Sequence, residues 1–374
     1  MKLVMAMKVR DEADVLEDNL RHHRAQGVDH FIVTDNGSTD GTLDVLRRWE
    51  GAGLLMLIEE PATEDFRDRA HWWVTRMARL AATDHGADWV AHADADEFWW
   101  PASGTLKGTL AEIPERYGVI LAPRPEFVPR ADDDRRFWER MTVREARSRL
   151  RPKIAHRAEP EALLHRGAHD VAIEGGEGGR HSGRAVMRGV KPDRSGEEVA
   201  LVWAPRWPAR VFHFPVRSLE QYRRKVEVAL RGGFHDRAHD ELRQAQDEGR
   251  VDELYANLVQ DPAAVEAGLR DGRLVSDERL RDFLARVPDP VQRPDAVPEA
   301  PAPSPQQVEA ELREIELDAM QTLARTQRSL IRQLDSFRRR LERQRRRAES
   351  ADRGRQWSRL RNGAARILRQ RREA

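Results

Sequence analysis

The chain has 374 residues, and 39% of them are apolar, enough for a core larger than that of one typical domain. It contains no cysteine, which excludes disulfides and thiolate metal sites, so any metal ion must be held by carboxylates or histidines. The formal net charge of +1 averages over an uneven distribution, because residues 338–374 carry 15 arginines against four acidic residues.

Strand-like and helix-like segments alternate over the first hundred residues, a pattern typical of an open parallel α/β sheet with helices on its faces. The predicted strands span residues 3–9, 30–34, 54–58 and 89–93. Helices are expected between them, and Asp11 or Asp14 is predicted to cap the first helix. In such a sheet the loops at the carboxyl ends of the strands converge on one cleft.

The pattern beyond Pro101 is less regular. Residues 117–128 and 199–214 are predicted to be strands with proline-marked edges, and residues 174–194 a long loop near the site or an insertion. A helix is expected to begin at Ser218, where Gln221 completes a capping box.

Composition then divides the chain into five segments. They are a main domain over 1–235, a helical extension over 236–286, a proline-rich linker over 287–306, a coiled-coil helix over 307–350 and a basic amphipathic tail over 351–374. The spacing of Leu323, Leu330 and Leu334 follows a heptad rhythm, which predicts a homo-oligomer. The tail suits an anionic membrane surface, a nucleic acid or anionic glycan, or a solvated helix.

The sequence also bears on location. It has no apolar run of about 18 residues, and the apolar stretch over 3–7 is too short for the core of a signal peptide. We therefore predict a cytoplasmic protein, with a peripheral position on the inner face of the plasma membrane if the tail binds anionic lipid.

Acidic residues cluster where the predicted strands end. Asp94 and Asp96 follow the strand over 89–93, and on extended chain their carboxylates lie on the same side, roughly 7 Å apart, where they can share a cation. A capped and solvated strand end is the alternative, and Asp132 with Asp134 is a second Asp-x-Asp copy that we interpret as a solvated loop. Asp35 ends the second strand, where its carboxylate can accept hydrogen bonds from a base or ribose, or form an ordinary Asx-turn.

Several motifs in this order resemble the family 2 glycosyltransferases, and most closely their branch with a DxDEF motif. The resemblance covers about residues 1–235 and rests on Lys8-Val9-Arg10-Asp11-Glu12, Asp35-Asn36-Gly37-Ser38-Thr39-Asp40-Gly41, Asp94-Ala95-Asp96-Glu97-Phe98, Lys153-Ile154-Ala155-His156, Gly167-Ala168-His169-Asp170-Val171 and His213-Phe214-Pro215-Val216-Arg217 with Lys225.

The resemblance implies a GT-A (Rossmann-like) α/β fold, a nucleoside diphosphate sugar donor, a Mn²⁺ or Mg²⁺ ion and inversion at the anomeric carbon. It implies that Asp35 contacts the base, that Asp94 contacts ribose or metal, and that Asp96 is the main metal ligand. The candidate histidine ligands are His213 first and His169 second. Arg217 and Lys225 are expected to reach the phosphates.

The catalytic base is less well defined, because the Glu-Asp pair common in the family is replaced here by His169-Asp170. Asp170 is the predicted base and Glu174 its alternative. The motif and membrane helices of processive synthases are absent, which predicts transfer of one sugar to a glycan, lipid or protein acceptor.

Two other functions compete with this one: a sugar nucleotidyltransferase, although residues 3–12 hold no phosphate-binding glycine, and a non-catalytic scaffold that presents the coiled coil.

Overall fold

The structure is a computed structural model that describes residues 1–62, 66–115, 117–165, 168–172, 208–231, 237–292 and 303–321, all within the unit Met1–Thr322. The predicted loop over 174–194 and residues 199–207 of a predicted strand lie outside the described residues. So do the heptad leucines from Leu323 onward and the basic tail.

A six-stranded mixed sheet lies at the centre of the described unit, in the order β3-β2-β1-β4-β8-β6. Its strands are β1 (Leu3–Val9), β2 (His30–Asn36), β3 (Leu55–Glu60), β4 (Trp89–Ala93), β6 (Val119–Ala122) and β8 (Lys153–Arg157). The first four strands along the chain run parallel, whereas β8 pairs antiparallel with β4 and β6. The predicted α/β class is confirmed, and the antiparallel edge is a feature that we did not predict.

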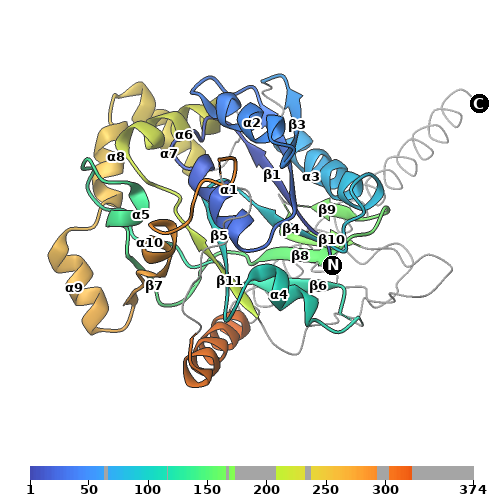
Figure 1. Ribbon diagram of the computed structural model, residues 1–374. Coiled ribbons are helices and arrows are strands. Elements are labelled where there is room, and N and C mark those ends of the chain that lie inside the picture. The colour runs from blue at the N-terminus through green and yellow to red at the C-terminus, as the bar shows by residue number, and fades with distance from the viewer. Residues whose placement is uncertain are drawn as a thin grey trace, which may run out of the picture. The chain divides into compact units, whose positions relative to one another are not determined.

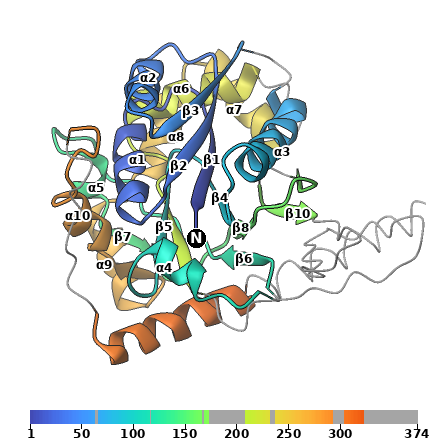
Figure 2. The same cartoon turned by 45° about the vertical axis from the view of Figure 1, so that its right-hand side comes forward.

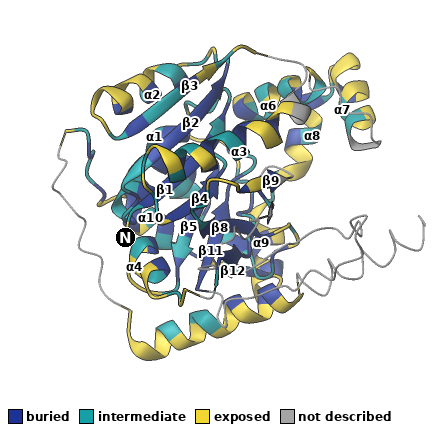
Figure 3. Cartoon of the chain, turned by 90° about the vertical axis from the view of Figure 1, so that its right-hand side faces the viewer, coloured by how far each residue is buried: buried dark blue, intermediate teal, exposed yellow. Residues whose placement is uncertain are grey.

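Helices cover both faces of this sheet (Figures 1 and 2). They are α1 (Leu16–Ala25), α2 (Thr42–Gly51) and α3 (Phe66–Thr83). Alternate residues of β1 divide between two cores: Leu3 and Met5 pack in the same cluster as Leu20 of α1, while Val4 packs with Met77 of α3. Because β1 is covered on both faces, its sequence is almost continuously apolar rather than alternating, and Figure 3 shows the buried strands between exposed outer helix faces.

The described residues also form three separate two-stranded sheets. They join β5 (Glu97–Pro101) to β11 (Ala209–His213), β7 (Val143–Glu145) to β12 (Leu274–Ser276), and β9 (Leu163–His165) to β10 (Asp170–Ala172). The first pairing matters most for the site, because it sets His213 opposite Glu97. The strand predicted over 117–128 is confirmed only over β6, which ends before Pro123, a residue with no N–H for a sheet hydrogen bond.

Short helices complete the unit. They are α4 (Leu106–Ala111), α5 (Phe137–Arg140), α6 (Leu219–Arg231), α7 (Arg237–Asp247), α8 (Val251–Leu258), α9 (Pro262–Arg270) and α10 (Arg279–Leu284). The Ser218 half of the predicted capping box is present at α6, since the Gln221 N–H donates to Ser218 Oγ at 3.0 Å, while Gln221 Oε1 accepts the N–H of Arg217 instead of that of Ser218. The predicted cap of α1 is wrong, because that helix follows Val15 with no side-chain cap. None of the described helices is long and apolar enough to span a bilayer.

A further helix over residues 305–321 belongs to the same unit and packs against its other elements. Ile315 and Ala319 are buried, the Ser148 N–H donates to Asp318 Oδ1 at 2.8 Å, and the Arg210 guanidinium lies 2.8 Å from Glu311. The first turns of the predicted coiled-coil segment therefore contact Ser148 and Arg210 of the same unit.

Candidate functional site

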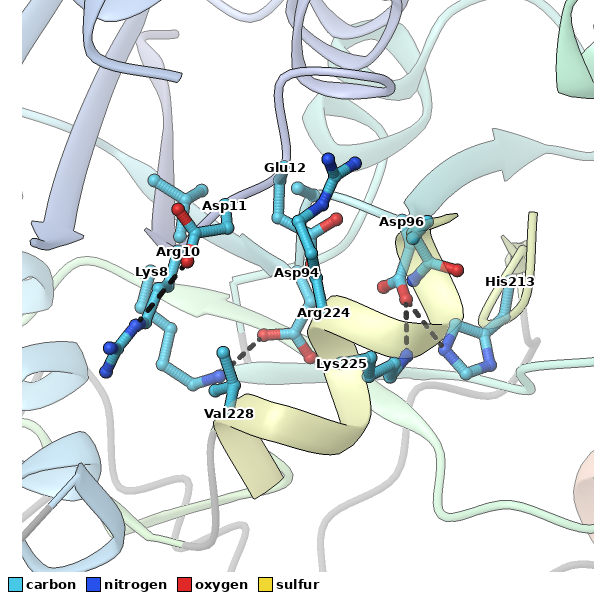
Figure 4. Close-up of a pocket in the computed structure, with 13 residues that line it drawn as sticks. Lys8, Arg10, Asp11, Glu12, Asp94, Asp96, His213, Arg224, Lys225 and Val228 are labelled. Carbon is cyan, nitrogen blue, oxygen red and sulfur yellow. Dashed lines mark hydrogen bonds and ion pairs between the residues drawn. The ribbon is translucent and has the colours of Figure 1, made fainter. Parts of the chain in front are cut away.

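Two neighbouring strand ends bring the predicted acidic residues together. In the parallel pair β1–β4, Met7 is in register with Ala93, so the loop that begins at Lys8 lies beside the loop that begins at Asp94. A cavity of about 240 Å³ opens there (Figure 4). It is lined by Lys8, Val9, Arg10, Asp11, Glu12, Asp94, Ala95, Asp96, His213, Gln221, Arg224, Lys225 and Val228.

Asp94 is held between two lysines. Lys8 Nζ donates to Asp94 Oδ1 at 3.0 Å, and Lys153 Nζ donates to Asp94 Oδ2 at 2.7 Å. Burial by itself would raise the pKa of the Asp94 carboxyl, but the charges of Lys153 and Lys8 hold that pKa well below its usual range. Asp94 is therefore a carboxylate throughout the physiological pH range, already in contact with two cations.

Glu97 follows Asp94 by three residues and is fully buried. Its carboxylate is 2.7 Å from Lys153 Nζ, pairs with Arg124, and accepts the Asp94 backbone N–H at 2.9 Å. Burial would raise the pKa of Glu97, but Lys153 and Arg124 lower it. The glutamate of the DxDEF motif thus sets the turn that presents Asp94 and Asp96, a role that we did not assign from sequence.

Asp96 projects from the other end of the same turn toward β11 and α6 (Figure 4). Its Oδ2 is 3.3 Å from Lys225 Nζ and 3.6 Å from His213 Nε2. Burial disfavours the charged form of Asp96, but Lys225 and His213 together hold its pKa far below the ordinary value. The structure therefore places the predicted residues Asp96, His213 and Lys225 in one contact group at the cavity.

Arg217 lies just before α6, where its guanidinium contacts two carboxylates. Only 1% of its side chain is exposed, and its guanidinium donates to Glu12 at 2.6 Å and to Asp14 at 2.7 Å. Arg217 does not line the cavity but ties the loop after β1 to the start of α6. These ion pairs also occupy Asp14, which accounts for the missing cap of α1. A contact between Arg217 and phosphate remains a prediction.

Asp35 is also separate from the cavity lining. It is buried, and its carboxylate accepts hydrogen bonds from the Ser38 hydroxyl and, at 3.0 Å, from the Ser38 backbone N–H. In this structure Asp35 therefore holds its own turn through Ser38, and its contact with a base remains a prediction. Gly37 in this turn has φ +68°, and a Cβ there would lie 2.6 Å from the Ala62 nitrogen.

The remaining predicted residues lie near β10. His169 does not line the cavity; its Nδ1 is 2.9 Å from the Pro152 carbonyl oxygen, and burial, with Lys153 and Arg124 nearby, lowers its pKa to about 3. Asp170 begins β10, but its side chain lies outside the described residues, as does all of Glu174. Both predicted base assignments therefore remain predictions.

The donor set bears on the predicted cation. Across the described ranges, no three histidine, aspartate or glutamate side chains converge as they would in a closed metal cage. Asp96 and His213 nevertheless face each other at the cavity wall, and a Mg²⁺ or Mn²⁺ ion that bridges phosphates needs only one or two protein ligands. These two residues fit such an open site.

The glycosyltransferase family 92 model matches residues 6–160 of the chain, the region that holds Asp94 and Asp96. The match covers less than half of the chain. It confirms the predicted likeness to glycosyltransferases for this region, while the predicted likeness to family 2 is not confirmed.

Solved structures similar to this chain include S. aureus TarS 1-349, alone and in complex with UDP. Each is 13% identical and covers 65% of this chain and 69% of that chain, with TM-scores of 0.31 and 0.33. The complex of TarS 1-349 with UDP-GlcNAc is 13% identical over 67% of this chain and 72% of that chain, with a TM-score of 0.31. No curated protein matches the chain.

Proposed function

We propose that this chain is a glycosyltransferase that moves one sugar from a nucleoside diphosphate sugar to a glycan, lipid or protein acceptor. The observation that carries the proposal is the cavity at the ends of β1 and β4, where Asp94 contacts Lys8 and Asp96 contacts Lys225. Such a cavity offers cations for a diphosphate and carboxylates for a bridging metal ion or ribose hydroxyls. The family 92 match over residues 6–160 supports the same class of reaction.

The basic side chains of the cavity are the proposed phosphate ligands. Arg10 comes from the loop after β1, while Arg224 and Lys225 come from α6. Lys225 is 45% exposed and reaches Asp96 through a long flexible side chain, so it can turn toward a phosphate that enters the cavity. An arginine beside a diphosphate provides paired N–H donors as well as charge.

Asp96 and His213 are the proposed protein ligands of a Mn²⁺ or Mg²⁺ ion. When bound, the ion would neutralise charge that develops on the diphosphate as it leaves. Both carboxylate oxygens of Asp94 already accept hydrogen bonds from lysines. We therefore assign Asp94 to holding the turn and to contact with ribose, rather than to the metal ion.

The proposed transfer inverts the anomeric carbon in one displacement. The acceptor oxygen forms a bond to the anomeric carbon, the bond from that carbon to the diphosphate oxygen breaks, and its electron pair leaves with the nucleoside diphosphate. The proton of the acceptor hydroxyl passes to a carboxylate, for which we retain Asp170 with Glu174 as alternative. We also propose that the chain belongs to the DxDEF branch of family 2 and that it self-associates through the leucines beyond residue 322.

Calorimetric titration of UDP and of GDP, with Mn²⁺ and with chelator, tests the proposal. Wild type should bind one nucleotide in a Mn²⁺-dependent manner, and Asp96→Asn should lose most of that binding. Asp134→Asn is the matched control, because Asp134 belongs to the exposed second Asp-x-Asp copy and should bind as wild type does. If neither nucleotide binds wild type under any condition, the proposal is wrong and the scaffold function takes its place.

A further inference from the structure

Glu126 contacts the candidate ligand His213 from the side away from the cavity. Its Oε1 lies 3.3 Å from His213 Nδ1, whereas His213 Nε2 lies 3.6 Å from Asp96 Oδ2. The two nitrogens of one imidazole therefore face two different carboxylates. Only Asp96 of these two carboxylates belongs to the cavity lining.

The backbone around Glu126 holds this residue beside His213. Residues 125–127 run beside the end of β11: the His213 N–H donates to the Pro125 carbonyl at 3.2 Å, and the Phe127 N–H donates to the His213 carbonyl at 2.8 Å. On its other side, β11 pairs with β5, with His213 opposite Glu97. Because the backbone of His213 is hydrogen-bonded on both sides, its ring can move only by rotation about its own side-chain bonds.

We infer that Glu126 is a positioning residue that holds His213 in the tautomer with a proton on Nδ1, and so keeps Nε2 free to bind a divalent cation together with Asp96. The inference rests on the proposed function. A histidine ligand commonly donates its second ring N–H to a carboxylate, which fixes the ring and makes the ligating nitrogen more basic. Without Glu126 the imidazole can carry its proton on Nε2 instead and donate that N–H to Asp96. Nε2 would then no longer be able to bind the cation.

Mn²⁺ affinity measures this role directly. The loss of the EPR signal of free Mn²⁺, with UDP or GDP present, is followed for wild type, Glu126→Gln and Glu126→Ala. Loss of a carboxylate behind a histidine ligand weakens metal binding by about 10- to 100-fold. We expect Glu126→Gln at the lower end, since its carbonyl oxygen can still accept the Nδ1–H, and Glu126→Ala at the higher end.

Asp29→Asn provides the matched control. Asp29 matches Glu126 in exposure and in having one ion-pair partner: Asp29 is 30% exposed and paired with Lys107, and Glu126 is 33% exposed and paired with His213. Asp29 lies at the opposite end of the parallel strands from the cavity. The control should bind Mn²⁺ as tightly as wild type. Urea midpoints of all variants show whether a change in affinity accompanies unfolding.

Three outcomes separate the possibilities. Weaker Mn²⁺ binding in both Glu126 variants, with Asp29→Asn unchanged, supports the inference. Equal affinity in wild type and both Glu126 variants overturns the role of Glu126 but leaves the cation site intact. No Mn²⁺ binding by wild type overturns the proposed cation site, and the role of Glu126 with it.

The tautomer can also be measured on wild type alone, which does not depend on the folding of any variant. The ¹⁵N shifts of His213, recorded without metal at a pH where the ring is neutral, should show a proton on Nδ1. A proton on Nε2 overturns the inference.

Discussion

Replacing Lys153 with methionine removes the cation that lies between two motif carboxylates. Lys153 is 1% exposed, and its Nζ is 2.7 Å from both Asp94 Oδ2 and Glu97 Oε2. Methionine is a flexible apolar residue that can fill much of the space, so the main change is the loss of charge. Removing one partner of a buried ion pair costs about 3–5 kcal/mol, because the other partner stays buried without compensation.

The expected cost for Lys153→Met is about 3 kcal/mol, at the lower end of that range. Lys8 still contacts Asp94, and Arg124 still contacts Glu97, so neither carboxylate is left without a cation. Urea unfolding followed by tryptophan fluorescence reports this loss. Trp89, which is fully buried on the strand that leads to Asp94, is among the residues whose emission should change.

Lys107→Met is the matched control. Lys107 Nζ also lies 2.7 Å from a carboxylate, that of Asp29, but Lys107 is 34% exposed. Water solvates both charges of this pair, so the expected cost is at most about 1 kcal/mol. Equal losses in the two variants would refute the reasoning that burial, rather than ion-pair distance, determines the cost.

A second prediction concerns pH: the pKa of Asp277 is about 2 because, although burial raises it, two neighbouring guanidinium groups lower it further. Since the pKa is lower in the folded state, the ionised side chain stabilises the fold by about 2 kcal/mol at neutral pH. Asp277→Asn should lose at least that amount at pH 7, and its deficit relative to wild type should shrink as the pH falls from about 4 to 2 in urea titrations. A third prediction concerns the turn after β2: Gly37→Ala combines a positive φ with a Cβ only 2.6 Å from the Ala62 nitrogen, whereas Gly53→Ala has a positive φ and open space. Thermal unfolding should show a loss of about 1 kcal/mol for Gly53→Ala and a clearly larger loss for Gly37→Ala, with weaker nucleotide binding only in the latter.

Much of the parallel sheet could be predicted from the sequence. The strands over 3–9 and 89–93 were predicted to the residue, because a strand covered on both faces is a short apolar run between polar loops. The position of Asp94 and Asp96 at the cavity followed from the rule that parallel strands present their carboxyl ends at one edge. These predictions depend on local patterns that a single segment contains.

The partners of those carboxylates could not be predicted in the same way. Arg124 and Glu126 follow a short edge strand and alternate with prolines, and nothing in such a segment indicates which side chain each charge will contact. Lys153 belongs to the motif Lys153-Ile154-Ala155-His156, but its contact with Asp94 joins residues 59 positions apart in the sequence. The contacts of Arg217 could not be predicted for the same reason, because a basic residue after a histidine motif suits a phosphate as well as the carboxylates of Glu12 and Asp14.

The sequence by itself determined the α/β class, the order of the parallel strands along the chain and the acidic ends of those strands, since hydrophobic periodicity and turn residues act over short distances. Only the tertiary structure decided which cation meets which carboxylate and which nitrogen of His213 faces the cavity. These contacts form where β11 pairs with β5 and where α6 lies beside the loop after β1. They join segments that are far apart in the sequence, so no local pattern in any one segment specifies them.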